Sequence, residues 1–436
     1  LLDLGYQVSG SDLRAGETTE RLTTLGGRIF LGHEAANVEG AQVVVYSTAV
    51  RPDNPEVVAA RAQGIPVIPR ADMLAELMRM KYGVAVAGSH GKTTTTSLSA
   101  AVLARGGLDP TIVVGGRLQS IGSNARLGRG QFLVAEADES DGSFLRLSPA
   151  VVIVTNIDRE HLDHYGSLEE LRQAFIYFAN RVPFYGVGIL CSDDPQVRGI
   201  LPQLTKRYVL YGTGPEAALR AADVRLGPEG SSFRVVADGN ELGEVRVHLP
   251  GMHSVLNALA AVGVGLELEV PFPHIVTALE GFRGVGRRFE LRGEAGGVRV
   301  VDDYGHHPTE VAATLAAART LGRRVLVMFQ PHRYTRTALL HREFGACFAD
   351  ADRVYVLDIY AAGETPVPGV TARTIVESAE ALGQGQVVYV GDGDAAVAAV
   401  AREARPGDLV LTLGAGDVWK LGDRLLARLR GAVEER

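Results

Sequence analysis

Short runs of apolar, mostly β-branched residues recur along the chain and limit the folds that it can adopt. They lie at 41–47, 84–88, 132–138, 151–156, 324–330, 353–358 and 408–414. Longer segments with helical patterning separate most of them. Continuous apolar runs of this length are typical of strands buried on both faces, as in parallel sheets covered by helices. The sequence therefore predicts an α/β fold.

Two joints divide the chain, whose 436 residues are too many for one compact core. An amphipathic helix expected over 70–82 leads into the apolar run at 84–88, and the glycine- and arginine-rich stretch at 281–297 is typical of a linker. Alternating polar and apolar residues at 222–250 predict a small antiparallel excursion. The domains that we expect are 1–81, 82–291 and 292–436.

The first residues resemble the end of a helix followed by a strand. Leu1 to Leu4 match a helical tail, Gly5 a helix cap, and Tyr6 to Ser9 a short strand. Because an α/β unit rarely starts within a helix, we expect about one strand and a turn to precede Leu1 in a longer natural protein.

Composition excludes several classes of partner. A net charge of -7 argues against nucleic acid, whose binding proteins carry basic surfaces. The two cysteines, Cys191 and Cys347, lie far apart and fit a reducing cytoplasm. No run approaches the roughly 18 apolar residues of a membrane-spanning helix, so we expect no membrane segment.

The segment 83–96, GVAVAGSHGKTTTT, predicts a phosphate-binding loop between a strand and a helix. The usual G-x-x-x-x-G-K-[ST] pattern is shortened here to G-x-x-G-K-T. Glycines let backbone N–H groups surround phosphate oxygens, and the helix N-terminus adds a favourable dipole. Lys92 is the natural phosphate contact and the Thr93 hydroxyl the natural metal ligand. The loop residues expected to bind ATP are Gly88, Ser89, His90, Gly91, Lys92, Thr93 and Thr94.

Acidic and histidine residues follow the next two predicted strands. Glu136 ends the run at 132–136, and His161 follows the run at 151–156, in the sequence NIDREHLDHYG. Acidic loops are usually just solvated, and a single histidine is usually structural. Two such clusters at neighbouring strand ends beside a phosphate loop favour Mg²⁺ binding, since this ion takes oxygen ligands.

Eight motifs, taken in order, resemble those of the Mur ligases. They are GSHGKTTT, EADESDGSF, NIDREHLDHYG, GMHSVLNALAA, RRFE, DDYGHHPTE, FQPHRYTRT and LTLGAGDVWK. The resemblance extends over essentially the whole chain, and the shortened phosphate loop is that family's own variant. It implies a Rossmann-like N-terminal domain for a UDP-sugar, a central P-loop ATPase domain and a Rossmann-like C-terminal domain.

The resemblance also implies a reaction. ATP phosphorylates the lactoyl carboxylate of UDP-N-acetylmuramate, and the amine of L-alanine attacks the resulting acyl phosphate. Positioning and charge neutralisation carry most of such catalysis, and two Mg²⁺ ions are expected because two anions must meet. The sequence DESDGSF after the glutamate favours the alanine-adding branch. The alternative is the recycling ligase that attaches a tripeptide to the same UDP-sugar.

Site residues follow from the resemblance, motif by motif. The residues that it implies for catalysis are Lys92, Glu136, His161 and Arg288, and those for metal binding are Thr93, Glu136 and His161. Those implied for the adenine and ribose of ATP are His253, Asn257 and Asp303. Those implied for L-alanine are Tyr304, His332, Arg333 and Arg336. Those implied for the UDP-sugar are Ser11, Asp12, Ser47 and Asn54, of which Ser11 and Asp12 follow the first expected strand.

The chain departs from the family pattern at three places. Glu160 replaces the aspartate of the usual DHLD, and Ser254 replaces the first asparagine of H-N-x-x-N. No lysine lies between Lys92 and Lys206, so the carbamylated lysine of several sister ligases has no counterpart. The family's glycine-rich diphosphate loop would belong before Leu1.

Two other classes remain as alternatives. A nicotinamide dehydrogenase would carry a G-x-G-x-x-G motif, which the sequence lacks. A nucleotide-driven switch protein would need no arginines for a carboxylate. Because the ATP and alanine residues belong to different expected domains, we expect the C-terminal domain to approach the central one during the reaction.

Overall fold

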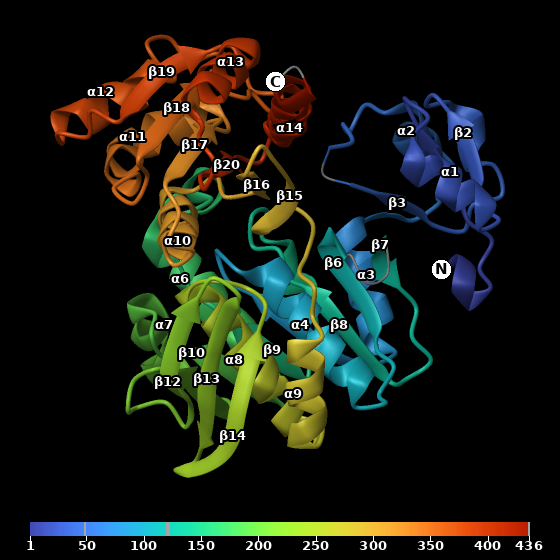
Figure 1. Ribbon diagram of the computed structural model, residues 1–436. Coiled ribbons are helices and arrows are strands. Elements are labelled where there is room, and N and C mark those ends of the chain that lie inside the picture. The colour runs from blue at the N-terminus through green and yellow to red at the C-terminus, as the bar shows by residue number, and fades with distance from the viewer. Residues whose placement is uncertain (48, 119–122, 435–436) are drawn as a thin grey trace.

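The structure is a computed structural model of residues 1–436, and it describes all of them except 48, 119–122 and 435–436. Figure 1 shows three lobes that follow one another along the chain. The N-terminal lobe is blue, the central lobe runs from light blue to yellow, and the C-terminal lobe is orange and red. The C-terminal lobe lies against the central lobe, beside α10.

The N-terminal lobe contains two pairs of parallel strands. Its strands are β1 (Ser9–Asp12), β2 (Arg28–Leu31), β3 (Val44–Tyr46) and β4 (Val67–Pro69), and β1 pairs with β2 and β3 with β4. Its helices are η1 (Leu2–Leu4), α1 (Glu17–Thr24), η2 (Ala35–Val38) and α2 (Pro55–Ala62). The helix α3 (Arg70–Arg79) leads into the central lobe, where Ala75 and Met78 join its core. The strand expected over 6–9 was wrong in its bounds. Pairing with β2 places the strand over a polar Ser-Gly-Ser-Asp sequence that has low strand preference.

The central lobe is built on a sheet in the order β14-β13-β12-β11-β10-β9-β5-β8-β6-β7. Its strands are β5 (Tyr82–Ala87), β6 (Thr111–Leu118), β7 (Ser123–Arg126), β8 (Phe132–Glu136), β9 (Val151–Val154), β10 (Val187–Cys191), β11 (Tyr208–Gly212), β12 (Leu219–Gly227), β13 (Gly230–Ala237) and β14 (Asn240–Val247). The pairs β12–β13 and β13–β14 are antiparallel, which confirms the excursion expected at 222–250.

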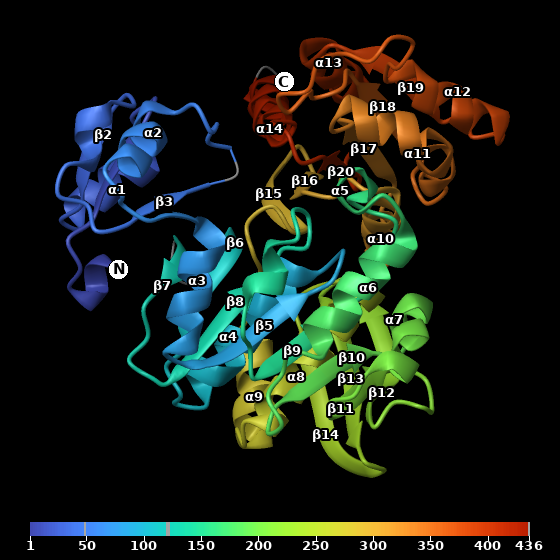
Figure 2. The same cartoon turned by 180° about the vertical axis from the view of Figure 1, so that it is seen from behind.

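Helices cover both faces of this sheet, as Figure 2 shows from behind. They are α4 (Lys92–Arg105), η3 (Ser143–Arg146), α5 (Leu162–Tyr165), α6 (Leu168–Ala179), α7 (Pro195–Ile200), η4 (Leu201–Gln203), α8 (Met252–Glu267) and α9 (Phe272–Glu280). Val84 and Val86 of β5 pack with the core under α4 and α8, whereas Ala85 and Ala87 pack with the core under α3 and α6. Burial on both faces is what the continuous apolar run predicted.

The C-terminal lobe repeats this construction with a six-stranded sheet in the order β15-β16-β20-β17-β18-β19. Its strands are β15 (Glu290–Ala295), β16 (Val298–Asp303), β17 (Val325–Phe329), β18 (Arg353–Leu357), β19 (Val387–Gly391) and β20 (Leu409–Leu413). Its helices are α10 (Pro308–Arg319), α11 (Tyr334–Cys347), α12 (Arg373–Ala381), α13 (Gly393–Glu403) and α14 (Trp419–Glu434).

The linker expected at 281–297 was wrong in its second half, because β15 occupies residues 290–295. A register shift between Leu291 and Gly293 interrupts the alternation of this strand, so the sequence shows no strand pattern there. The strand also crosses the expected boundary between 291 and 292. The domain boundaries stay a prediction, and we place this one before Glu290.

The arrangement brings chemically active strand ends together. The strand β5 lies between β8 and β9, with which it is parallel, so the carboxyl ends of all three meet at one edge. Open α/β sheets bind ligands at such an edge. Among the helices of the described residues, none combines the length and the apolar character that crossing a membrane requires.

Candidate active site

The phosphate loop has a shape that only glycine permits at two positions. Gly88 and Gly91 have φ angles of 133° and 81°, in the region that other residues rarely adopt. A Cβ atom on Gly88 would collide with Thr155 Oγ1, and one on Gly91 would lie 2.6 Å from Asn257 Oδ1. The loop is therefore packed tightly against the strand end after β9 and against α8.

The helix α4 begins directly after this loop, at Lys92. Gly91 at its cap position has no side chain to accept from the N–H groups of the first turn. The nearby hydroxyl of Thr96 does not accept from them either, because it donates to the backbone oxygen of Lys92 over 2.8 Å. A helix N-terminus of this kind suits an anion, because its N–H groups and dipole both favour negative charge.

Lys92 is held by a buried carboxylate of the same lobe. Its Nζ lies 2.8 Å from Glu139 Oε2 and donates to Gly88 O over 2.7 Å. Burial opposes the charge of Lys92, but the charge of Glu139 outweighs it and raises the pKa of Lys92. Burial also raises the pKa of Glu139 to about 7, against the effect of Lys92. Lys92 therefore stays protonated at neutral pH.

The expected metal ligands fall into two groups. Thr93 Oγ1 donates to Glu136 Oε1 over 3.2 Å, and Gly115 N donates to Glu136 Oε2 over 2.8 Å. A hydroxyl and a carboxylate are hard oxygen ligands of the type that Mg²⁺ prefers. His161 instead lies with Glu139 and Glu160, and one ligand atom from each of these three lies within 4.8 Å of the others.

His161 is suited to ligate because its imidazole is neutral. Burial lowers its pKa, and the charges of Lys92 and Arg336 add to this effect, although Glu160 opposes it. A metal ion binds the neutral form of imidazole. Carboxylate and imidazole at this second group thus fit a divalent cation, with Glu139 as a candidate ligand that the sequence analysis did not select. Glu160, the third member, is paired with Arg336.

A cavity of about 440 Å³ lies beside the phosphate loop, between the central and C-terminal lobes. Seven of the residues expected to contact ATP or to act in catalysis line it: His90, Gly91, Thr94, His253, Asn257, Arg288 and Asp303. The structure therefore brings together residues from four separate motifs around one space.

His253 and Asn257 lie one turn apart on α8 and face this cavity, as their spacing predicted. Burial and the nearby charge of Arg288 lower the pKa of His253 to about 4, so its ring is neutral. Asn257 accepts from Thr95 Oγ1 over 3.0 Å, which fixes its amide against α4.

Asp303 ends β16 on the opposite wall of the cavity. It accepts from Phe289 N and Gly305 N, each over 2.8 Å, and burial raises its pKa. These bonds fix the chain on both sides of the carboxylate. The guanidinium carbon of Arg288 lies 4.9 Å from the ring centre of Tyr304, which places this arginine at the same edge.

The side chains expected to bind L-alanine gather only in part. The rings of Tyr304, His306, His332 and Tyr360 form a row, with neighbouring centroids 5.2, 5.5 and 5.7 Å apart. Burial lowers the pKa of His332 to about 3, together with the charge of His306. Arg336 Nη1 lies 3.4 Å from His332 Nδ1. Arg333 is exposed and begins α11 with a φ of 71°.

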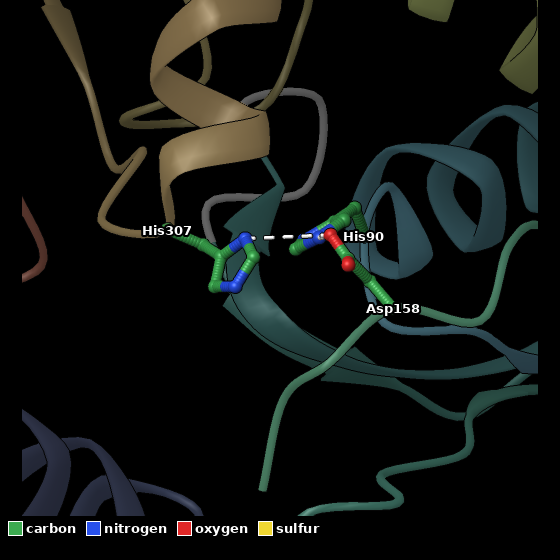
Figure 3. Close-up of side chains that lie close together, drawn as sticks. All are labelled: His90, Asp158 and His307. Atoms are coloured by element: carbon green, nitrogen blue, oxygen red, sulfur yellow. Dashed lines mark hydrogen bonds and ion pairs between the residues drawn. The ribbon is translucent and has the colours of Figure 1, made fainter. Parts of the chain in front are cut away.

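Figure 3 shows three side chains that meet at the junction of the two lobes: His90 of the phosphate loop, Asp158 after β9, and His307 before α10. His90 Nε2 lies 2.8 Å and His307 Nδ1 3.4 Å from Asp158 Oδ2. His90 Nδ1 lies 3.2 Å from Glu310 Oε1.

His90 is a buried cation. Burial alone would lower its pKa, but hydrogen bonds to Asp158 and Glu310 outweigh burial and raise the pKa to about 10. Ligand atoms of His90, Asp158 and His307 lie close enough to share a metal ion. Both ring nitrogens of His90 face carboxylate oxygens, however, so an ion-pair cluster explains these contacts better than a metal ion does.

The residues expected to bind the UDP-sugar lie in the N-terminal lobe. Ser11 Oγ donates to Glu56 Oε2 over 2.7 Å, and Asn54 Oδ1 caps α2 by accepting from Glu56 N over 2.9 Å. Asp12 and Ser47 are exposed. Ser11 and Asp12 lie within β1 rather than after it, which corrects that expectation.

Comparison with known families matches the chain over most of its length. The description "Mur ligase family, catalytic domain" matches residues 1–82, "Mur ligase middle domain" matches 86–265, and "Mur ligase, glutamate ligase domain" matches 287–416. The chain belongs to the Mur ligase family. The resemblance inferred from the eight motifs is therefore confirmed.

Individual Mur ligases share both sequence and fold with this chain. A UDP-N-acetylmuramate–L-alanine ligase of Geobacter sp. (strain M21) is 56% identical over 436 residues, covering 100% of this chain and 95% of the relative. One of Solibacter usitatus is 56% identical over 432 residues, covering 99% and 92%. The crystal structure of a UDP-N-acetylmuramate–alanine ligase from Thermotoga maritima has a TM-score of 0.81 at 29% identity, covering 99% and 95%.

A murein peptide ligase from Psychrobacter arcticus is more distant. Its crystal structure has a TM-score of 0.69 at 23% identity, covering 98% of this chain and 95% of that one. At that identity the likeness shows the fold alone. The three-domain α/β fold expected for Mur ligases is thus confirmed, and the full-length relatives at 53–56% identity carry the name of the alanine-adding branch.

The sequence analysis did not select several residues of the site. They are Glu139, Asp158, Glu160, His306, His307 and Glu310. All six lie within the motifs EADESDGSF, NIDREHLDHYG and DDYGHHPTE, so a signal was present. Their roles could not be predicted from the motifs, because the residues of DDYGHHPTE pair with side chains of the central lobe, which lie far away in the sequence.

Proposed function

We propose that this Mur ligase uses ATP to join L-alanine to the lactoyl carboxylate of UDP-N-acetylmuramate. The observation that carries this function is the 56% identity, over the whole chain, with a relative of that name. The phosphate loop, the cavity beside it and the cationic side chains of the C-terminal lobe are consistent with the reaction.

ATP binds in the cavity between the lobes. The N-terminus of α4 and Lys92 hold the triphosphate, since the helix dipole of about half a charge cannot balance it alone. Arg288 approaches the phosphates from the C-terminal side. His253 and Asn257 face the adenine, and Asp303 accepts from the ribose. The bonds that already fix Asp303 support this last role, because they hold its carboxylate at the cavity wall.

Mg²⁺ is bound by the residues that offer hard oxygen ligands. Thr93 and Glu136 would hold one ion, and His161 with Glu139 would hold a second. When bound, these ions neutralise the phosphate oxygens and the carboxylate that must approach them. The protein's own part is to position the reacting groups and to exclude water, which makes phosphate transfer to the carboxylate fast.

The acyl phosphate formed in this way is a good electrophile, because phosphate leaves readily where a carboxylate oxygen does not. The amine of L-alanine attacks it, and amide and phosphate result. Tyr304, His332, Arg333 and Arg336 form the amino-acid site, where an arginine matches a carboxylate in geometry and charge. Ser11, Asp12, Ser47 and Asn54 contact the UDP-sugar. The cytoplasmic location stays a prediction.

Release of phosphate from ATP tests this function. The protein is incubated with ATP, Mg²⁺ and UDP-N-acetylmuramate, together with L-alanine, with the stem tripeptide or with no acceptor. We expect release that requires both the UDP-sugar and L-alanine. A requirement for the tripeptide would assign the recycling reaction instead. Release that is indifferent to both would leave a nucleotide hydrolase.

A further inference from the structure

Arg336, expected to bind the carboxylate of the amino acid, is already paired with a carboxylate of the central lobe. Its Nη2 donates to Glu160 Oε1 over 2.7 Å, and the two side chains are 11% and 5% exposed. Among the described residues, Glu160 is the only carboxylate within ion-pair distance of this guanidinium. The charge that an amino-acid carboxylate would need is thus balanced from within the chain.

Glu160, by contrast, has several imidazole neighbours, of which His90 is held as a cation. Its Oε1 also lies 3.8 Å from His306 Nε2, and its Oε2 lies 3.9 Å from both His90 Nδ1 and His161 Nε2. If Glu160 left Arg336, three imidazoles would remain around it. An exchange of carboxylates on Arg336 would therefore leave no buried charge without a partner, which is the costly outcome in a protein interior.

The length of the Glu160 side chain matters for this contact. Aspartate is shorter by one methylene, roughly 1.5 Å. The contact of 2.7 Å between Glu160 and Arg336 spans two lobes, so a carboxylate that is shorter by this amount would lie beyond hydrogen-bond distance.

We propose that Glu160 is a positioning residue that competes with the amino-acid substrate for Arg336. Glu160 holds the guanidinium until the carboxylate of L-alanine displaces it. The competition lowers the affinity for L-alanine and links its binding to the loss of an ion pair between the lobes. This inference rests on the proposed function, because it takes Arg336 as the site of the substrate carboxylate.

The test compares four full-length proteins: wild type, Glu160→Asp, Glu160→Gln and Asp163→Asn. Glu160→Asp keeps the negative charge beside His161 but withdraws it from Arg336. Glu160→Gln removes the charge and keeps the length. Asp163 is an exposed carboxylate on α5, so its variant controls for the loss of a charge nearby. Melting temperatures confirm that each variant is folded.

Two amino compounds are titrated in the presence of Mg²⁺, UDP-N-acetylmuramate and a non-hydrolysable ATP analogue. They are L-alanine and L-alaninamide, which lacks the carboxylate. Calorimetry gives the dissociation constants, and KM for L-alanine is measured in parallel with ATP. We expect Glu160→Asp to bind L-alanine about ten-fold more tightly, the effect of one charged hydrogen bond. Binding of L-alaninamide should stay within two-fold, roughly the error of such a comparison.

Unchanged or weaker binding of L-alanine by both Glu160 variants would overturn the competition. An equal change for L-alanine and L-alaninamide would overturn it as well, because a structural role would not depend on the carboxylate. The failure of the proposed function looks different. In that case the wild type would release phosphate from ATP without any need for L-alanine. This result is seen with the wild type alone and does not depend on the variants.

Discussion

Lys92 and His90 lie two residues apart on the phosphate loop, yet their charges are balanced in different ways. Lys92 pairs with Glu139, which belongs to the same lobe and is fully buried. His90 pairs with Asp158 of the central lobe and also with Glu310 on α10 of the C-terminal lobe. One cation is held within a lobe, and the other holds two lobes together.

This difference indicates which contacts can change during the reaction. Partners within one lobe stay together whenever that lobe is folded. Partners in different lobes stay together only while the lobes are close, as with Thr309 Oγ1, which donates to Asp158 Oδ2 over 2.6 Å. Domain closure during the reaction stays a prediction, and contacts of the second kind are those that it would make and break.

The largest effect is expected at the first of these cations. Replacing Lys92 by methionine removes the charge that we propose faces the triphosphate, so kcat should fall about 10³-fold, as for other groups that stabilise a transition state. Lys81→Met is the matched control, since Lys81 lies outside the phosphate loop and donates to the backbone oxygens of Gly128 and Gly130. A steady-state assay measures both variants. Similar losses in the two would remove Lys92 from the catalytic group.

Replacing Glu139 by glutamine should affect both stability and rate. The variant leaves Lys92 as a buried charge without its counter-ion, which costs about 3 kcal/mol of unfolding free energy. Loss of the fixed lysine position should lower kcat about ten-fold. Urea unfolding and the steady-state assay measure the two effects. A change in rate without a change in stability would show that the pair is not a structural element of the lobe.

Asp158→Asn tests the contact between lobes. The change removes the charge that faces His90 and His307, while the central lobe keeps its own core. We expect the radius of gyration in X-ray scattering to rise, because the lobes separate more readily. Activity should fall several-fold, which corresponds to the loss of a contact worth about 1 kcal/mol. Asp163→Asn is the control. The scattering curve could instead stay unchanged while the unfolding free energy falls as much as in Glu139→Gln. In that case His90, like Lys92, would stabilise a single lobe and would not hold the two lobes together.

The last prediction is a dependence of stability on pH. The pKa of His90 is raised from 6.5 to about 10, so folding favours its protonated form. Its contribution is complete below pH 6.5 and is lost as the pH rises to 10. The melting temperature of wild type should exceed that of His90→Gln at pH 6.5, and the difference should vanish by pH 10. His274→Gln, at an exposed position, is the control. A constant difference would contradict the assignment.

Elements with a strong local signal were predicted well. The runs at 84–88 and 151–156 became β5 and β9 because both faces of each strand are apolar and buried. The short β1 and the edge strand β15 were misplaced or missed. Their residues are polar or glycine-rich, and pairing with a neighbouring strand determines their structure.

The same contrast between local and long-range interactions applies to the prediction of the site. The α/β fold, the phosphate loop and the face shared by His253 and Asn257 could be predicted from the sequence, because each depends on residues close together in the chain. The contacts of Glu160 with Arg336 and of His90 with Glu310 became visible in the folded structure alone. These partners lie 176 and 220 positions apart, on lobes whose approach no local pattern encodes.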